Sequence, residues 1–424
     1  MGNLDYTQVL NKIENTRRFG NEPGVVVTAQ VIKVLREKGK QKRIIPYIHV
    51  AGTNGKGSVC AFFSSILKKE HMRVGTFVSP HLVDFEERIT VDGRMIPKED
   101  VTRLGNYLLD IDFGIGLTMF DYCLAMALLY FEEQQCDYMV IETGLGGRLD
   151  STNAIGTPQC AVITKIGYDH MAILGSDIAD IAAEKAGIIK ENSTVVVEQQ
   201  DKRAMQVIEQ EAKKKHARII TVEQSDIARC SGYALRLCGT FQWENAAAAE
   251  LAARYVLGKR YSGPEYKMQY DKTEPKSEKT DLNDRIKSAL EEAVWPGRME
   301  IVSKEPFLLV DGAHNSNGVD ALKESLMQMY PGEKFCFFMG VMADKDYDVM
   351  IREILPLAEE FYTVTPDSDR ALQASHLADF IRKEGVCATE LSGVDEIRKH
   401  LKRDTKNVAF GSLYFIGELK QHRI

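Results

Sequence analysis

The sequence lacks the features of a secreted or zinc-binding protein. Its 424 residues contain eight cysteines, which occur singly, and the closest two, Cys230 and Cys238, form no Cys-x-x-Cys pair. No Cys/His spacing typical of zinc sites is present, so free thiols in a reducing cytoplasm are the simplest interpretation. The start, MGNLDYTQVL, has no basic region followed by an apolar core, and Tyr6 occupies the position where a myristoylation signal needs Ser or Thr.

Long apolar runs and excess positive charge are also missing. The most apolar long window, residues 118–131, contains Asp121 and is too short to cross a bilayer. The net charge of −7 argues against a nucleic-acid-binding surface, although a local basic patch would suffice for an anionic substrate. We therefore expect a soluble cytoplasmic monomer with small-molecule substrates and neither membrane nor nucleic acid as a partner.

An alternation of short β-rich runs with helical patterns is the main structural signal. In the first part of the chain it includes RIIPYIHV, DYMVIET, CAVITKI and STVVVEQ; after WPGR it resumes with FLLVDGAHN, KFCFFMGV and NVAFGS. Such alternation predicts mostly parallel sheets covered by helices. We expect an α/β protein with a P-loop ATPase domain over residues 1–297 and a smaller Rossmann-like α/β domain over residues 298–424.

Two helices and one irregular segment are expected within the first domain. The helical spacing of apolar residues predicts helices over residues 57–70 and 246–257. From 259 to 285 the chain is rich in charge and poor in aliphatic residues, which indicates a solvated excursion between the domains. The Pro296-Gly297 pair after it is a candidate hinge.

The segment HVAGTNGKGSVC, residues 49–60, resembles a phosphate-binding loop. It departs from the usual G-x-x-x-x-G-K-[ST] pattern, because Val50 stands at the first glycine position and Gly57 is inserted after Lys56. A strand before, a helix after and glycines that let the backbone approach an anion still favour phosphate binding over a plain turn. Lys56 would neutralise terminal phosphate oxygens, and Ser58 would offer its hydroxyl to Mg²⁺. The predicted nucleotide-binding residues of this loop are Gly52, Thr53, Asn54, Gly55, Lys56, Gly57 and Ser58.

Three polar residues follow successive predicted strands or lie on the next helix. Glu142 is the last residue of DYMVIE. His170 is the last residue of TKIGYDH and lies just past a predicted strand. Lys185 lies in DIADIAAEKAGIIK. Singly, each has an ordinary structural explanation: a turn cap, a hydrogen-bonded turn residue and a solvated helix lysine. Carboxyl ends of parallel strands meet at one sheet edge, however, so their joint occurrence favours a metal-assisted nucleotide site.

Seven segments then resemble those of folylpolyglutamate and dihydrofolate synthases, which belong with the ATP-dependent Mur ligases. They occur in the family's order: HVAGTNGKGS, SPHLVDFEERI, IETGLGGRLDSTN, DHMAILG with IAAEKAGIIK, WPGRME, DGAHN and GSLYFIGE. The segments span nearly the whole chain, apart from the charged stretch 259–285.

The resemblance implies a set of metal ligands and nucleotide contacts. Ser58 and Glu142 would hold one Mg²⁺, and Glu142, His170 and a carbamylated Lys185 would hold a second. Capture of CO₂ by a neutral lysine amine is chemically reasonable when a divalent metal favours the resulting anion. The implied contacts to base, ribose and phosphates are Gln242, Asn245, Arg298, Asp311 and His314, with Arg298 reaching the nucleotide from the second domain. Asp311 has a structural alternative, because it could simply cap the turn that follows its strand.

The acceptor end of the site is less sharply predicted. Its candidate residues are Ser79, His81, Phe120, Asp121, Arg148 and Asp150. Phe120 could stack on a flat ring, but it is equally well explained as a core residue of its helix. The family usually has Asn at Glu86 and Glu at Asp121, and these departures concern substrate detail rather than the reaction.

The function implied is an ATP-dependent ligase that adds L-glutamate to folates, or to dihydropteroate, through an acyl phosphate. The catalytic candidates are Lys56, His170, Lys185 and Arg298. Two alternatives stay open: a cell-wall ligase acting on a uridine nucleotide, and a nucleotide-dependent regulatory switch. Against the first, the phosphate loop begins only about 50 residues into the chain, which leaves no room for a further nucleotide-binding domain. Against the second, a switch would not need a second α/β domain.

Overall fold

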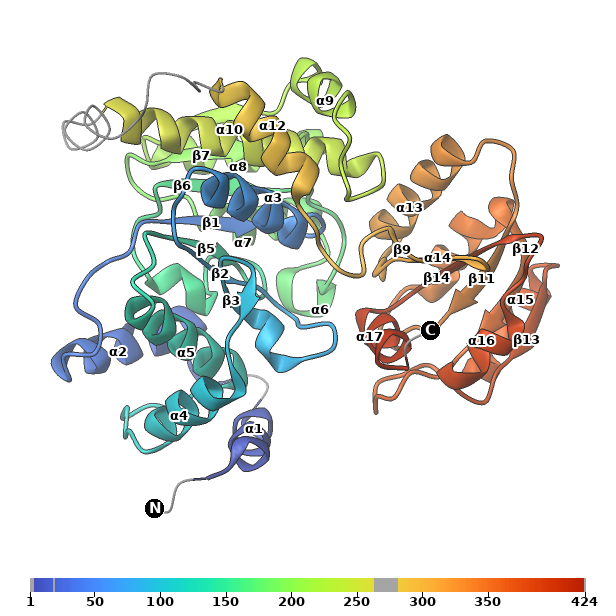
Figure 1. The fold of residues 1–424 in the computed structure, drawn as a ribbon, viewed down its shortest axis with the longest axis horizontal. Coiled ribbons are helices and arrows are strands. Elements are labelled where there is room, and N and C mark those ends of the chain that lie inside the picture. The colour runs from blue at the N-terminus through green and yellow to red at the C-terminus, as the bar shows by residue number, and fades with distance from the viewer. Residues whose placement is uncertain (1–3, 18–19, 263–280, 423–424) are drawn as a thin grey trace. The chain divides into compact units, whose positions relative to one another are not determined.

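The computed structural model describes residues 4–17, 20–262 and 281–422, which divide into two compact units. The first unit consists of Met1–His81, Phe85–Ala234 and Glu244–Ala293; the second consists of Leu82–Asp84, Leu235–Trp243 and Val294–Ile424. Both are α/β units (Figure 1). The domain boundary placed at residues 297 and 298 stays a prediction.

An eight-stranded sheet forms the centre of the first unit. Its order is β4-β3-β2-β5-β1-β6-β7-β8, and every neighbouring pair from β2 to β8 is parallel. The strands are β1 (Tyr47–Ala51), β2 (Val74–Phe77), β3 (Ile89–Val91), β4 (Arg94–Met95), β5 (Tyr138–Glu142), β6 (Cys160–Ile163), β7 (Thr194–Val197) and β8 (Arg218–Thr221). The predicted mostly parallel sheet is thus confirmed. The antiparallel β3–β4 hairpin was not predicted, although its turn, Asp92-Gly93, is a common hairpin sequence with positive φ at both residues.

Helices cover both faces of this sheet, as Figure 1 shows. Strand register places Tyr47, Ile141 and Ile163 on one face, where they join two apolar clusters. These clusters contain residues of α1 (Tyr6–Glu14), α2 (Gly24–Glu37), α4 (Lys98–Leu109), α5 (Met119–Glu133), α7 (Ile178–Ala186) and α8 (Lys202–Lys214). The opposite face is covered by α3 (Lys56–Lys69), α10 (Phe241–Ser262) and α12 (Leu282–Glu292). Two shorter helices, α6 (Met171–Leu174) and α9 (Gln224–Ser231), lie in connections.

The second unit has a six-stranded sheet of order β13-β12-β11-β14-β10-β9, in which only β9 runs antiparallel to its neighbour. The strands are β9 (Glu300–Lys304), β10 (Phe307–Val310), β11 (Phe335–Met339), β12 (Ala358–Thr363), β13 (Cys387–Glu390) and β14 (Lys406–Phe410). One face packs with α13 (Ser316–Met329), α14 (Tyr347–Ile354) and α15 (Ala374–Lys383), the other with α16 (Ile397–His400) and α17 (Leu413–Gln421).

The charged stretch differs from the expected excursion over residues 259–285. Helix α10 continues through Ser262 and α12 begins at Leu282, so both ends of the stretch are helical; residues 263–280 lie outside the described residues. Charged residues do not prevent this, because Lys, Arg and Glu are good helix formers. On α12, Arg285 Nε donates to Glu70 Oε1 at 2.7 Å, which ties the helix to the end of α3.

The cysteines and the apolar helices were both subjects of predictions from the sequence. All eight cysteines are free thiols, as expected. In the described part of the chain, no helix combines the length and apolarity needed to cross a bilayer.

Candidate active site

The connection from β1 to α3 has the backbone geometry of a phosphate loop. Gly55, which immediately precedes α3, has φ 89°, a conformation that favours glycine. A Cβ at Gly55 would lie 2.2 Å from Asn245 Oδ1, and one at Gly52 would lie 1.8 Å from Thr164 Oγ1. Both glycines are therefore required by close neighbours. The first turn of α3 has no side-chain cap, so its backbone N–H groups are available to an anion.

The loop is anchored on the segment that follows β6. The backbone N–H groups of Thr53 and Asn54 both donate to the Lys165 carbonyl oxygen, at 2.9 and 3.2 Å. Thr164 Oγ1 donates to the Asn54 carbonyl oxygen at 2.6 Å, and Thr53 Oγ1 donates to the Gly167 carbonyl oxygen at 3.0 Å. The path of the loop is thus fixed by residues that follow the neighbouring strand.

Lys56 and Glu142 face each other at the carboxyl edge of the sheet. Register pairs Val50 with Glu142, so the acid lies beside the end of β1. Lys56 Nζ donates to the carbonyl oxygens of Gly52 and Thr53, both at 3.2 Å, and lies 3.9 Å from Glu142 Oε1. The other carboxylate oxygen of Glu142 accepts from the Ser79 backbone N–H at 3.1 Å. Three sequence-predicted residues are therefore brought together here.

Lys185 is buried rather than solvated. It lies in the last turn of α7, with 4% of its surface exposed, and its Nζ donates to the Gly52 carbonyl oxygen at 2.8 Å. Burial, followed by repulsion from Lys56, lowers the pKa of Lys185 from 10.5 to about 7. The default expectation of a solvent-exposed helix lysine was wrong, because the glycine loop after β5 packs against this end of α7. A Cβ at Gly147 would lie 3.0 Å from the Lys185 carbonyl oxygen.

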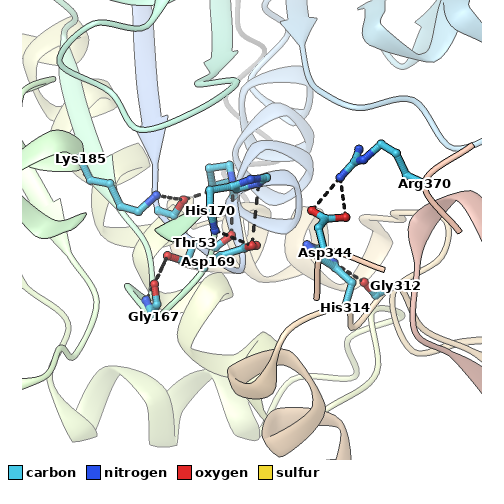
Figure 2. A network of polar contacts seen from close by, with 11 residues as sticks. Thr53, Gly167, Asp169, His170, Lys185, Gly312, His314, Asp344 and Arg370 are labelled. Carbon is cyan, nitrogen blue, oxygen red and sulfur yellow. Dashed lines mark hydrogen bonds and ion pairs between the residues drawn. The ribbon is translucent and has the colours of Figure 1, made fainter. Parts of the chain in front are cut away.

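His170 lies in the loop before α6, next to an acid that the sequence analysis did not single out. Its backbone has φ 52°, and its Nε2 lies 3.9 Å from Asp169 Oδ1. Asp169 also counteracts the lowering of the Lys185 pKa, which places its charge in the same region. Figure 2 shows Lys185, Thr53, Asp169 and His170 around the phosphate loop.

The donor set fits magnesium bound largely by a nucleotide. Among the described residues, no group of three or more His, Cys, Asp or Glu side chains could hold a metal by itself. Magnesium, however, is commonly bound by one or two carboxylates together with substrate phosphates and water. Ser58 and Glu142 are both nearly buried, and they lie at the loop start of α3 and the end of β5. A hydroxyl and a carboxylate beside a phosphate loop match that chemistry.

Three of the predicted acceptor residues, Phe120, Asp121 and Asp150, lie around one turn of the first unit. Asp121 is the third residue of α5 and accepts from Thr118 and Ser151, while Asp150 accepts from Leu145 N at 2.9 Å. Phe120 is half-buried and packs on Phe77, with ring centroids 5.5 Å apart; a Cβ at Gly144 would lie 2.7 Å from its ring. Its partial burial is compatible with both interpretations of this aromatic side chain.

His81 and Arg148 are each held by a charged neighbour. Arg88 Nε donates to His81 Nδ1 at 2.8 Å, so the remaining ring proton of a neutral His81 is on Nε2. Arg148 is exposed and pairs with Glu184, with Nη2 and Oε1 2.6 Å apart. This pair keeps Arg148 beside the end of α7 that carries Lys185.

In the second unit, the loop after β10 gathers three predicted nucleotide contacts. Buried Asp311 accepts from Met299 N at 2.8 Å and from Ala313 N at 2.7 Å, so it does cap its turn. Burial raises the pKa of Asp311, and Arg298 opposes that shift. His314 Nδ1 lies 2.8 Å from the Gly312 carbonyl oxygen, and a Cβ at Gly312 would lie 2.4 Å from Arg298 Nη1. Figure 2 shows this histidine and the nearby Asp344–Arg370 ion pair.

Helix α10 carries the two residues implied in base recognition. Gln242 is fully buried near the start of the helix, in the part assigned to the second unit. Asn245 is buried in the first unit and contacts Gly55 of the phosphate loop. The structure thus places Asn245 at the phosphate loop, whereas contact of either residue with a base stays a prediction.

Two family models match successive parts of the chain. Residues 50–253 match the Mur ligase middle domain, and residues 297–411 match the Mur ligase glutamate ligase domain. The chain is 33% identical to a dihydrofolate synthase/folylpolyglutamate synthase of Bacillus subtilis, over 98% of each chain. It is 30% identical to a folylpolyglutamate synthase of Lacticaseibacillus casei, over 87% of each chain.

Solved structures show the same fold. A Mycobacterium tuberculosis folylpolyglutamate synthase complexed with ADP and AMPPCP has a TM-score of 0.83 and 25% identity, covering 99% of this chain and 98% of its own. E. coli FolC in complex with DHPP and ADP has a TM-score of 0.80 and 26% identity, covering 99% of this chain and 97% of its own. The sequence resemblance is therefore confirmed: the chain belongs to the folylpolyglutamate synthase/dihydrofolate synthase family of the Mur ligases.

Proposed function

We propose that this protein is an ATP-dependent ligase that joins L-glutamate to folates and to dihydropteroate, releasing ADP and phosphate. The observation that carries the proposal is the phosphate loop, where Lys56 lies 3.9 Å from Glu142 and Lys185 donates to Gly52. The names of its relatives as synthases and the nucleotides bound in their structures support the same reaction.

The reaction needs activation because a carboxylate oxygen is a poor leaving group in amide formation. An oxygen of the acceptor carboxylate attacks the γ-phosphorus of ATP, and the bond between that phosphorus and ADP breaks. The glutamate nitrogen then attacks the acyl carbon, loses a proton, and displaces inorganic phosphate. Since little covalent chemistry falls to the protein, positioning and charge neutralisation supply most of the catalysis.

Residues of the first unit are suited to these tasks. The first turn of α3 offers backbone N–H groups to the phosphates, and Lys56 is placed to exchange its two carbonyl contacts for phosphate oxygens. One carboxylate oxygen of Glu142 pairs with Lys56 and the other accepts from Ser79 N, so Glu142 holds these two residues close together. These residues hold the transferring group while the acceptor carboxylate approaches.

Two magnesium ions form part of the proposal and would neutralise charge on the phosphates. Ser58 and Glu142 would hold the first, and Glu142, His170 and Lys185 the second. Lys185 provides no oxygen as an amine, so it fits the second position only as a carbamate. The buried, partly uncharged lysine beside Asp169 supports that modification.

Several finer assignments belong to the same proposal. We assign Arg298, Asp311, His314, Gln242 and Asn245 to the nucleotide, and Ser79, His81, Phe120, Asp121, Arg148 and Asp150 to the acceptor. The predicted domains 1–297 and 298–424 would act as ATP-binding and glutamate ligase domains.

The test is ADP release by the full chain with MgATP and glutamate, comparing dihydropteroate, a reduced folate and no acceptor. Turnover with both acceptors is expected. Turnover with a uridine-nucleotide acceptor alone would favour a cell-wall ligase, and acceptor-independent ATP hydrolysis would favour a regulatory switch. During confirmed turnover, oxygen-18 in the acceptor carboxylate must appear in the released phosphate; its absence would exclude the acyl phosphate.

A further inference from the structure

Three consecutive residues in the turn after the glycine loop form hydrogen bonds to three different parts of the first unit. Asp150 accepts from Leu145 N and thereby closes the loop that follows β5. Ser151 Oγ donates to Asp121 Oδ1 of α5 at 2.6 Å. Thr152 Oγ1 lies 2.7 Å from Nε2 of His49 in β1. We call residues 150–152 the junction turn.

The hydrogen bonds of the junction turn determine where the protons lie. Thr152 Oγ1 donates to Asp150 Oδ1 at 2.5 Å, and the same oxygen of Asp150 accepts from Thr152 N at 3.0 Å. Because a hydroxyl has one proton, Thr152 Oγ1 must accept from His49 Nε2–H. His49 therefore carries a proton on Nε2, and a neutral ring would leave its second nitrogen, Nδ1, unprotonated.

The surroundings of His49 agree with this assignment. The side chain is fully buried, and within the described residues Nδ1 has no hydrogen-bond partner. A protonated Nδ1 would leave a buried donor unsatisfied, which is costly. Burial, followed by the charge of Lys190, also lowers the pKa of His49 to about 3. Within the described residues, the buried imidazole of His49 therefore makes one side-chain hydrogen bond, from Nε2 to Thr152 Oγ1.

The junction turn connects the nucleotide side and the acceptor side of the first unit. His49 is three residues before Gly52 on the strand that ends in the phosphate loop. The loop closed by Asp150 begins after Glu142, and its Gly144 contacts Phe120. Ser151 is also fixed against α2, since a Cβ at Gly24 would lie 2.3 Å from its Oγ. A shift of Thr152 relative to β1 would therefore move the predicted acceptor residues relative to the phosphate loop.

We propose that His49 and Thr152 are positioning residues for the acceptor substrate, which act by holding Asp150 and the glycine loop 143–150 in place against β1. This inference rests on the proposed function, because it assumes that the acceptor binds against this loop. Neither residue needs to touch the substrate. Their effect is on the alignment of the acceptor carboxylate with the nucleotide, and misalignment of reacting groups by about 1 Å can reduce a rate about a hundredfold.

Two matched pairs of variants test the proposal in the full chain. Thr152→Ser keeps the hydroxyl, whereas Thr152→Val keeps the shape and removes it. His49→Gln can place an amide nitrogen near the position of Nε2, whereas His49→Asn places it near that of Nδ1. We expect Thr152→Val and His49→Asn to raise the acceptor KM or lower kcat about tenfold to a hundredfold, with ATP affinity within about twofold of wild type. Thr152→Ser and His49→Gln should recover most of the activity.

The measurements distinguish a loss of substrate alignment from a loss of folded protein, and both of these from an error in the proposed function. Active protein is counted by nucleotide binding, so that kcat refers to folded molecules. If Thr152→Val has wild-type kcat and acceptor KM per folded molecule, or if both members of a pair behave alike, the proposal is wrong. A His49 that carries its proton on Nδ1 in nitrogen-15 spectra of the wild type would also contradict it. Absence of turnover in the wild type with any folate acceptor would instead refute the proposed function.

Discussion

Lys185 Nζ and Lys56 Nζ both donate to the carbonyl oxygen of Gly52, at 2.8 and 3.2 Å. Two lysine side chains from different helices thus meet at one backbone atom of the phosphate loop. Together with burial, repulsion from Lys56 lowers the pKa of Lys185, which favours the neutral amine that the proposed carbamate requires.

Removal of either lysine should abolish turnover while leaving the fold intact. We expect Lys56→Ala and Lys185→Ala each to lower kcat about a thousandfold or more, because each removes charge or a ligand at the transferring phosphoryl group. The measurement is ADP release alongside circular dichroism. Lys69→Ala is the control, since Lys69 lies at the other end of α3 and pairs with Glu292 at the surface. Near-normal kcat in either site variant would contradict the assignment.

Glu142→Gln tests the role of the negative charge at this position, because glutamine has nearly the same shape as glutamate. The amide can still accept from Ser79 N, but it loses the negative charge beside Lys56 and much of its value as a magnesium ligand. We expect kcat to fall about a hundredfold or more and the magnesium concentration for half-maximal activity to rise. Glu133→Gln, at the exposed end of α5, should match wild type. An unchanged magnesium dependence would remove Glu142 from the metal site.

Two glycines with similar backbone angles should respond differently to alanine. Gly55 has φ 89° and Gly93 has φ 76°, so both substitutions introduce strain of about 1 to 2 kcal/mol in unfolding free energy. Only at Gly55 would the new Cβ also collide, 2.2 Å from Asn245 Oδ1, whereas no atom lies within 4 Å at Gly93. Gly55→Ala should therefore weaken nucleotide binding about tenfold or more, measured by calorimetry. Equal affinities in the two variants would show that the loop tolerates a side chain.

Glu198 should make folding stability depend on pH. Burial, followed by the nearby Glu244 carboxylate, raises the pKa of Glu198 well above 4.5. From pH 4.5 upward the unfolded chain ionises while the folded chain keeps the proton, so this group costs increasing stability until its folded pKa is reached. Glu198→Gln removes that cost and can still accept from Lys165 N.

We expect the stabilisation by Glu198→Gln to be small near pH 4.5 and to grow by up to about 1.4 kcal/mol per pH unit above it. Urea unfolding of wild type and variant across the pH range measures the difference. Glu209→Gln, on the exposed side of α8, is the control and should unfold like the wild type at every pH. A difference that shrinks as pH rises would show that Glu198 is ionised in the folded protein.

Much of the fold was predictable because its central strands are buried on both faces. Runs such as those of β5, β6 and β7 are buried throughout and apolar apart from Glu142 and Thr194, and turn residues flank them, which makes them recognisable. Strands β9 and β13 were missed because they are short edge strands, partly exposed, with no clear alternation. The helical ends of the stretch 259–285 were missed because a charged composition resembles that of a solvated loop.

The candidate site was predictable where residues follow strand ends, and not where it depends on tertiary contacts. Lys56 and Glu142 lie together because β1 and β5 are neighbours, as the parallel-sheet argument anticipates. Nothing in the local sequence shows that Thr164 bonds to Asn54, 110 residues away, or that His49 bonds to Thr152. The burial of Lys185 likewise follows from packing of the glycine loop on α7, which helical periodicity alone does not reveal.

The double hydrogen bond from Thr53 and Asn54 to the Lys165 carbonyl oxygen has a consequence for nucleotide entry. Those two amides already have partners within the protein, so the segment after β6 holds the loop in one shape before phosphate binds. Binding then avoids the entropic cost of ordering a flexible glycine segment, and more of the interaction energy remains available as affinity. We expect nucleotide to bind to and dissociate from such a preformed loop rapidly. The later chemical steps would then limit the rate of turnover.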